Sequence, residues 1–179
     1  MDMQAFRIFI PELHLQTASF LPNDHRANVG QESAQRNFNI EYSDDNQFPG
    51  YFPDFPVIIS GKTLEPWTLS NLYLLRKTAF DEIPYEAATY ESISQSLLDY
   101  LRFLERNNID ALEFHPRFKS NRPTYRYRQD LLDRRRNESI APSTASKHMR
   151  NVVRFYRGLV SYGILESEIL KRVHVARKI

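Results

Sequence analysis

The stretch SIAPSTASKHMRNVVRFYRGLVSYGIL, residues 139–165, predicts one amphipathic helix with an apolar face and a basic face opposite it. At about 100° per residue, its apolar side chains fall within about 120°, the width of a stripe that packs on a core. They are Ala145, Met149, Val152, Val153, Tyr156, Leu159 and Val160. The opposite side carries Lys147, Arg150, Arg154 and Arg157. Pro142 suits the first helical position and Gly163 supplies a left-handed stop, so the helix is predicted over 142–162.

Positive charge is concentrated around this helix. Residues 1–90 carry six Lys and Arg against 12 Asp and Glu, a net charge of −6, whereas residues 91–179 carry 18 against 10, a net charge of +8. Residues 115–160 alone hold 12 basic and three acidic side chains, a net charge of +9. A basic excess that recurs on successive elements is typical of proteins that bind polyanions, because each neutralised phosphate releases condensed counterions. The distribution therefore favours a nucleic-acid partner over a solvated basic face.

Helical periodicity continues on both sides of residues 139–165. Helices are predicted over residues 66–78, 89–107, 124–137 and 166–173. Thr89 and Thr124 are the expected N-caps of the second and third of these helices. Asp130 and Arg134 form an acid-first i, i+4 pair, so Arg134 is as well explained by helix stabilisation as by ligand binding.

The N-terminal part of the chain has a different pattern, rich in aromatic and turn-forming residues. Short strands are predicted over residues 6–10 and 56–59, a polar tract over 22–47, and a turn-prone segment, FPGYFPDFP, over 48–56. We therefore expect a mainly α protein in two parts. Residues 1–80 would form an N-terminal region of short strands, long loops and one helix, and residues 85–179 a helical domain.

Several classes of function find no support in the residues. The absence of cysteine excludes disulfides, thiol nucleophiles and cysteine-based zinc sites, and the five histidines lack the spacing of a metal site. The five glycines form no G-x-S-x-G motif, P-loop or dinucleotide-binding motif. No signal peptide and no apolar stretch of about 20 residues is present. We expect a soluble cytoplasmic protein without metal or small-molecule cofactor.

The order of these features resembles a known family. The first segments that carry this resemblance are LLDYLRFLERNNID at residues 97–110, YRYRQDLL at 125–132 and the Pro-Ser-Thr helix start at 142–144. RFYRGLVSYG at residues 154–163 follows on the same helix. Together they resemble the core-binding domain of tyrosine recombinases, the phage-integrase family, over residues 89–173. PVIISGKTLEPWTLSNLYLLRKT, residues 56–78, is similar to the segment that precedes this domain in many integrases.

The resemblance implies a four- or five-helix bundle of the SAM-like, core-binding type that clamps one side of duplex DNA. A separate catalytic domain would clamp the other side and carry out DNA integration and recombination through a tyrosine nucleophile. The resemblance places that domain after the last residue of this chain, so no catalytic residue is expected here. The implied partners are double-stranded DNA and, during synapsis, other recombinase protomers. No membrane partner is implied, and the protein would associate with the nucleoid when bound to DNA.

Charge and resemblance together select a set of candidate DNA-binding residues. They are Lys119, Arg122, Arg126, Arg128, Arg134, Arg135, Arg136, Thr144, Lys147, Arg150, Arg154, Arg157, Lys171 and Arg172. Lys147, Arg150 and Arg154 are the ones expected to reach base edges, whereas Lys119 and Arg122 would hold the backbone. Lys171 and Arg172 also suit the C-terminal end of a helix. Two alternatives remain open: a helical protein-interaction module with acidic and basic halves, and an RNA-binding helical domain.

Overall fold

The computed structural model describes residues 3–14, 17–22, 38–43, 51–80, 85–114 and 117–173. The strands are β1 (Phe6–His14), β2 (Thr17–Pro22), β3 (Phe38–Ser43) and β4 (Tyr51–Ile59). The helices are α1 (Thr68–Phe80), α2 (Ala87–Arg106), α3 (Pro123–Arg136), α4 (Pro142–Ser161) and α5 (Glu168–Val173), with a 3-10 turn, η1 (Lys119–Asn121), before α3. The expected mainly α fold with N-terminal strands is confirmed, and each predicted helix ends within two residues of the observed position.

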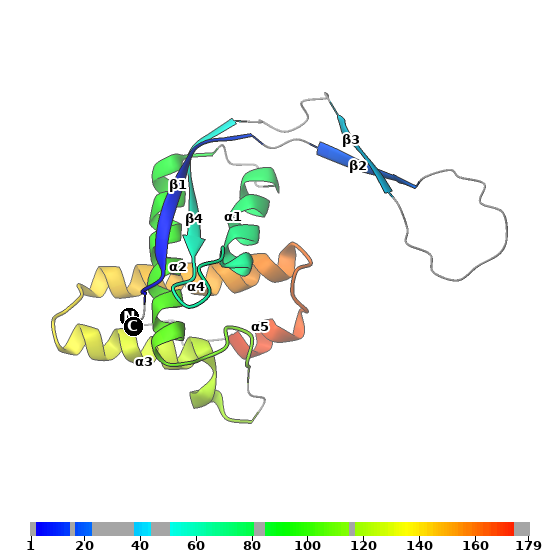
Figure 1. Cartoon of the computed structure of the whole chain (residues 1–179). Coiled ribbons are helices and arrows are strands. Elements are labelled where there is room, and N and C mark those ends of the chain that lie inside the picture. Colours follow the sequence, from blue (N-terminus) through cyan, green and yellow to red (C-terminus); the bar gives the residue numbers. More distant parts are fainter. Residues whose placement is uncertain are drawn as a thin grey trace.

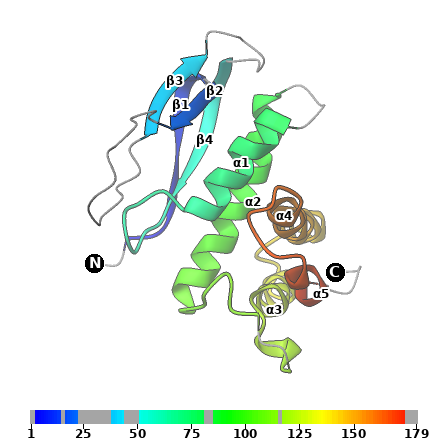
Figure 2. The same ribbon diagram turned by 90° about the vertical axis from the view of Figure 1, so that its right-hand side faces the viewer.

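The described elements form three layers around α2. The β1–β4 ribbon covers one side of α2, and α3, α4 and α5 lie on the other side (Figure 2). α1 lies beside α2 and contacts both β4 and α4, while α3 and α4 pack against each other (Figure 1). Because α2 is covered from two sides, it buries residues around much of its circumference, including Tyr90, Leu98, Tyr100 and Leu101.

α4 confirms the predicted helix, but the face that it buries is wider than the apolar stripe predicted from the sequence. The buried residues are Ala145, His148, Met149, Asn151, Val152, Phe155, Tyr156 and Leu159. Val153 and Val160, placed at the edge of the predicted stripe, are only half-buried. The buried face is turned towards Asn151 and Phe155 because α4 packs against α1, α2 and α3 at once, and not against a single neighbour. The basic side predicted opposite to the core faces away from it, as expected.

Tyrosine side chains form the centre of the core between α2, α3 and α4. Tyr100, Tyr127 and Tyr156 are fully buried, and the Tyr100 ring centroid lies 4.9 Å from that of Tyr127. The Tyr100 and Tyr156 hydroxyls share a hydrogen bond of 2.8 Å, and the Tyr156 hydroxyl also lies 2.6 Å from the carbonyl of Ala111, to which it donates. Burial raises the pKa of Tyr100 well above its ordinary value. Tyr127 and Tyr156 therefore belong to the core and are inaccessible for stacking on bases.

The turn predicted for residues 48–56 is wrong for residues 51–56, which lie in β4. β4 pairs antiparallel with β1 from Phe6 opposite Ile59 to His14 opposite Tyr51. Asp54 adopts a positive φ of 51° at the point where the ladder between Ile10–Phe55 and Glu12–Pro53 is interrupted. The strand is thus determined by a partner that lies far away in the sequence. The predicted polar tract, 22–47, lies outside the described residues except where it overlaps β2 and β3.

Both predicted N-caps are wrong. α2 begins at Ala87 after Glu86, and the Thr89 hydroxyl, inside the first turn, lies 2.7 Å from the Glu86 carboxylate and donates to it. α3 begins at Pro123, so Thr124 also lies inside the first turn and is buried. Proline is favoured at the first helical position because it has no N–H to leave unpaired, and this preference decided the start of α3.

Gly158 allows α4 to approach α1 closely. A Cβ atom at this position would lie 2.4 Å from Cε2 and 2.8 Å from Cδ2 of the buried Tyr73 ring. We expect Gly158→Ala to lower the free energy of unfolding by about 1–3 kcal/mol, because overpacking outweighs the gain in helix propensity. Denaturant unfolding would measure the loss. Ser143→Ala, exposed on the same helix, should stay within about 0.5 kcal/mol of the parent. A stabilised Gly158→Ala variant would contradict the close packing.

Candidate nucleic-acid interface

The outward side of α4 carries a row of cations, which we call the α4 basic face: Lys147, Arg150, Arg154 and Arg157. The three arginines are exposed and Lys147 is half-buried. Within the described residues none of the four forms an ion pair, and α4 itself contains no Asp or Glu. At 1.5 Å per residue the row extends over about 15 Å. Its positive charge is therefore not neutralised by neighbouring side chains of the described chain.

The opposite side of α4 fixes the orientation of this face. Phe155 packs edge-on against Tyr73 of α1, with ring centroids 5.5 Å apart. Asn151 Nδ2 donates a hydrogen bond of 3.0 Å to Ser96 Oγ of α2, and both residues are buried. Tyr156 adds its hydrogen bond to Ala111. Because α4 is held by specific polar contacts as well as by apolar packing, its outward cations stand on a rigid support.

Three further predicted residues are exposed and form no ion pair within the described part of the chain: Lys119, Arg126 and Arg135. Arg126 and Arg135 are nine residues apart on α3, so at about 100° per residue they project from opposite sides of that helix. They therefore do not belong to one face. Arg128 on α3 and Thr144 in the first turn of α4 are half-buried.

Three other predicted cations are paired with acidic side chains. Arg134 lies 2.9 Å from Asp99 Oδ2 and 3.3 Å from Asp130. Arg136 pairs with Asp133 at 3.1 Å, and Lys171 pairs with Glu168 at 2.8 Å. Arg134 is the least exposed of the three and binds Asp99 through both of its terminal nitrogens. These contacts give Arg134 a structural role, as its i, i+4 spacing to an acid already suggested.

The last two predicted cations hold the connection between α2 and α3 against α5. Arg122 is buried, and its Nη1 donates to the carbonyl of Arg172 at 3.2 Å. Arg172 Nη1 in turn donates to the carbonyl of Phe114 at 3.3 Å. These interactions fix the chain that enters α3, and a DNA contact by Arg122 or Arg172 stays a prediction.

Asp99 is the principal residue of this region that the sequence did not single out. It accepts hydrogen bonds from the Tyr127 hydroxyl, at 2.7 Å, and from Arg134, so it ties α2 to α3. Burial raises the pKa of the Asp99 carboxyl, but the bonds from Arg134 and Tyr127 outweigh it and hold that pKa below its ordinary value. A lone acid inside the apolar run LLDYL was the signal in the sequence that could have found it.

His148 lies in the same buried region, on the inner side of α4. Burial is the main cause that lowers its pKa below the ordinary value of 6.5; Asp99 opposes this, and Arg134 and Lys147 add to it. Because the unfolded chain binds a proton at about pH 6.5 and the folded chain resists it, acidification favours unfolding. We expect the free energy of unfolding to fall between about pH 7 and pH 5, as measured by denaturant titration.

The same titration on His148→Leu would test the assignment. The fall in stability below about pH 6.5 should become shallower in this variant, whatever its absolute stability at neutral pH. The comparison is between slopes, so a constant loss from the substitution itself does not affect it. Identical pH slopes in the two proteins would show that His148 is not the titrating group.

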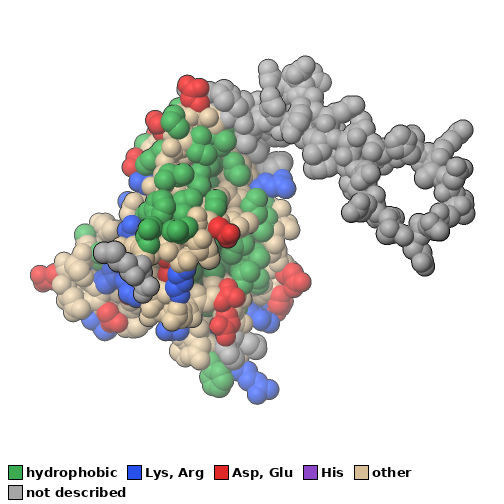
Figure 3. Space-filling view, in the orientation of Figure 1, with side chains coloured by type: hydrophobic (Ala, Val, Ile, Leu, Met, Phe, Trp, Pro, Cys, Tyr) green, Lys and Arg blue, Asp and Glu red, His purple; other side chains and the backbone are tan. Residues whose placement is uncertain are grey.

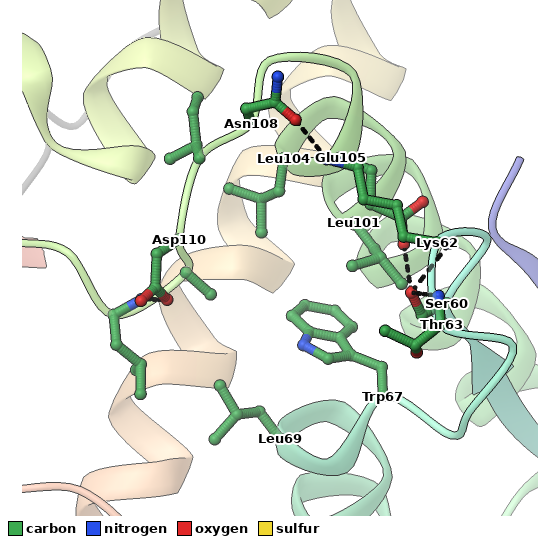
Figure 4. A pocket seen from close by; sticks show the side chains of 13 residues that line it. Ser60, Lys62, Thr63, Trp67, Leu69, Leu101, Leu104, Glu105, Asn108 and Asp110 are labelled. Carbon is green, nitrogen blue, oxygen red and sulfur yellow. Dashed lines mark hydrogen bonds between the residues drawn. The ribbon is translucent and has the colours of Figure 1, made fainter. Parts of the chain in front are cut away.

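A pocket with a volume of about 430 Å³ lies between the β4–α1 turn and the C-terminal half of α2 (Figure 4). Trp67, Leu101 and Leu104 line its apolar part. Two acids, Glu105 and Asp110, line it, and Glu105 is already engaged, because it accepts hydrogen bonds from Ser60 Oγ at 2.6 Å and from the Gly61 N–H at 3.0 Å. Across the described ranges no group of three His, Asp or Glu side chains could hold a metal ion. Glu105 thus acts as a brace for the turn.

Comparisons of this chain with protein-family models, curated proteins and solved structures find no match. None of the helices in the described ranges is long and apolar enough to cross a membrane. The functional argument therefore rests on the charge and geometry of the helices themselves.

Proposed function

We propose that this chain binds double-stranded DNA through the α4 basic face. The observation that carries the proposal is a row of four cations, free of ion pairs within the described residues, on a helix whose opposite side is rigidly packed. The major groove of B-DNA is wide enough to admit a helix, and cations along the helix reach both base edges and flanking phosphates. Such a face gains affinity by releasing counterions from the duplex.

In this arrangement α4 is the reading helix. Lys147, Arg150 and Arg154, from the middle of the helix, would reach base edges, whereas Arg157 would contact a phosphate. Lys119 and either Arg126 or Arg135, the two exposed arginines of α3 without an ion pair in the described chain, would add backbone contacts beside the groove. The ion-paired Arg136 and Lys171 would contribute little, because a phosphate would have to compete with their existing partners.

We infer further that the helices α2 to α5 are the core-binding bundle of a site-specific tyrosine recombinase or integrase, of the SAM-like type. The support is the resemblance of residues 89–173 to that family, together with a helical arrangement in which a basic helix faces outward. In this role the chain would clamp one side of its DNA site, and other protomers would be its partners during synapsis. Strand exchange would need a catalytic domain outside this chain.

Binding to duplex DNA across a series of salt concentrations tests the proposal, with single-stranded DNA and RNA hairpins as competitors. The whole chain should prefer the duplex, and log K should fall with log salt with a slope of about −0.9 for each phosphate contacted. Preference for RNA hairpins would favour the RNA-binding alternative. Weak binding without any duplex preference would indicate only a nonspecific electrostatic attraction to nucleic acid. It would favour a protein-interaction module.

A further inference from the structure

The outer edge of β1 carries backbone groups that no described element covers. On the other side of the ribbon, the backbone of Ile58 is capped by Asn71: the Ile58 N–H donates to Asn71 Oδ1 and Asn71 Nδ2 donates to the Ile58 carbonyl, both at 3.0 Å. The Ile58 carbonyl also accepts the Trp67 N–H at 2.8 Å. The backbone groups of Ile58 therefore point away from β1, towards α1.

This direction determines where the backbone of β1 points. Arg7 lies opposite Ile58, and in an antiparallel pair both residues of such a position turn their N–H and C=O groups outward. Because the direction alternates along a strand, Phe9 also points outward, while Ile8 pairs with β4. The carbonyl of Ala5 has the same outward direction and accepts a hydrogen bond of 2.8 Å from Arg102 Nε. That contact agrees with the outward direction inferred for the backbone groups of Arg7 and Phe9.

The open part of this edge is short and defined at both ends. At one end the Ala5 carbonyl is already occupied by Arg102, and at the other end Pro11 has no N–H to offer. Between them Arg7 and Phe9 each present one donor and one acceptor, and within the described ranges no hydrogen bond reaches these groups. Four backbone hydrogen-bonding groups are thus available for another strand.

The side chains of this segment are apolar where an exposed edge is usually protected by charge. Ile8 is 45% exposed and Phe9 41%, and apolar side chains gather over β1 and β4 (Figure 3). The one cation in the segment, Arg7, is turned towards α2, where Nη1 donates to the Glu91 carbonyl and to Ser94 Oγ, both at 2.8 Å. A guanidinium held in this way does not guard the edge against pairing.

We propose that β1 pairs with β1 of a second copy of this chain, antiparallel about a two-fold axis that passes beside Ile8. Arg7 then lies opposite Phe9 of the second copy, and the two pairs exchange four backbone hydrogen bonds. The two Ile8 residues form the closely spaced, non-hydrogen-bonded pair between them, so their exposed side chains cover each other. The two ribbons become one four-stranded antiparallel sheet. This dimer does not depend on the DNA-binding proposal.

The ends of the open segment favour a second copy over another extended peptide. In the two-fold arrangement Ala5 faces Pro11 of the second copy, at both ends of the paired segment. The Ala5 carbonyl needs no further donor because Arg102 occupies it, and Pro11 has no N–H that would seek an acceptor. A partner strand with an ordinary residue at this position would bury an unpaired N–H there. The edge is therefore complementary to itself.

Sedimentation equilibrium of the whole chain without DNA tests this dimer, with Phe9→Pro compared to Phe9→Ala. Both variants lose the aromatic ring, but only proline removes the outward N–H, and by symmetry it removes it twice. The intrachain ladder keeps its bonds because the Phe9 N–H does not belong to it. We expect the dimer dissociation constant to rise about 10- to 100-fold in Phe9→Pro relative to Phe9→Ala.

Ile8→Lys provides a second, independent test that leaves every backbone donor in place. It sets two like charges side by side at the two-fold axis, so the variant should be monomeric at concentrations where the parent is a dimer. Circular dichroism would show that both variants keep the helical fold, and Ile8→Lys decides the matter if Phe9→Pro unfolds. A parent chain that stays monomeric at millimolar concentration, or a dimer that is unchanged in the folded variants, would overturn the proposal.

Discussion

Removing Arg150 and Arg154 together by alanine substitution should weaken binding to duplex DNA by about 10- to 100-fold at physiological salt. Both arginines are exposed, and neither has an acidic partner within the described residues, so their charge is available to the DNA. Because both arginines are expected at base edges, the slope of log K against log salt should change by less than the value of about 1.8 that the loss of two phosphate contacts would cause. A fluorescence anisotropy titration at several salt concentrations measures both quantities.

Arg136→Ala combined with Lys171→Ala is the matched control, because this pair lowers the net charge by the same amount. Both cations are exposed but ion-paired, with Asp133 and Glu168 respectively, so this variant should bind within a few-fold of the parent. Equal losses in the two double variants would show that only the overall charge matters. Unchanged binding after loss of Arg150 and Arg154 would show that α4 is not the interface.

How the loss of affinity depends on the DNA sequence distinguishes base contacts from phosphate contacts on the α4 basic face. A variant that loses a phosphate contact weakens binding similarly for all sequences, whereas loss of a base contact costs roughly 1–3 kcal/mol at one base pair only. We expect Arg154→Ala to relax the preference at one position of a selected site, and Arg157→Ala to weaken all sequences alike. Selection of binding sites with each variant would measure the preferences.

The second large effect is expected on stability. Asp99→Asn should lower the free energy of unfolding by about 2–4 kcal/mol, as measured by denaturant titration at neutral pH. The amide keeps the shape of the carboxylate but loses its charge, so Arg134 loses its bidentate partner and Tyr127, whose hydroxyl is buried, loses a charged acceptor. Partial exposure of Asp99 and Arg134 keeps the loss below that of a fully buried pair.

Asp133→Asn is the control for this substitution on the same group of helices. Asp133 pairs with the exposed Arg136 and accepts an exposed hydrogen bond from Gln129 Nε2, both on α3, so the variant should stay within about 0.5 kcal/mol of the parent. Because the Asp99 pKa is lowered in the folded state, its contribution is present above the ordinary pKa of 3.8 and is lost as the pH falls below it. The stabilities of the parent and Asp99→Asn should therefore converge in acid. A neutral-pH loss equal to that of the control would contradict the structural role.

The helices could be predicted from sequence because their signals are local. Periodicity, Pro142 at the start and Gly163 with a φ of 70° after the end were sufficient to delimit α4 and to assign its two sides. The predicted strand over residues 56–59 lies in β4, but residues 51–55 of that strand could not be predicted in the same way. Its prolines and Asp54 are typical of turns, and only pairing with β1, whose partner residues lie 37 to 53 positions earlier, makes the segment a strand. Local preference gave way to long-range pairing.

The sequence by itself determined the mainly α fold and the α4 basic face, because composition and a 3.6-residue period already separate the two sides of a helix. Only the tertiary structure decided which cations remain available. Arg122 and Arg134 are engaged by residues that fold back from α5 and α2, whereas Arg150 and Arg154 meet no acid in the described chain. The open edge of β1 also required the structure, since backbone direction follows from the register of a non-local pair and leaves no mark in the sequence.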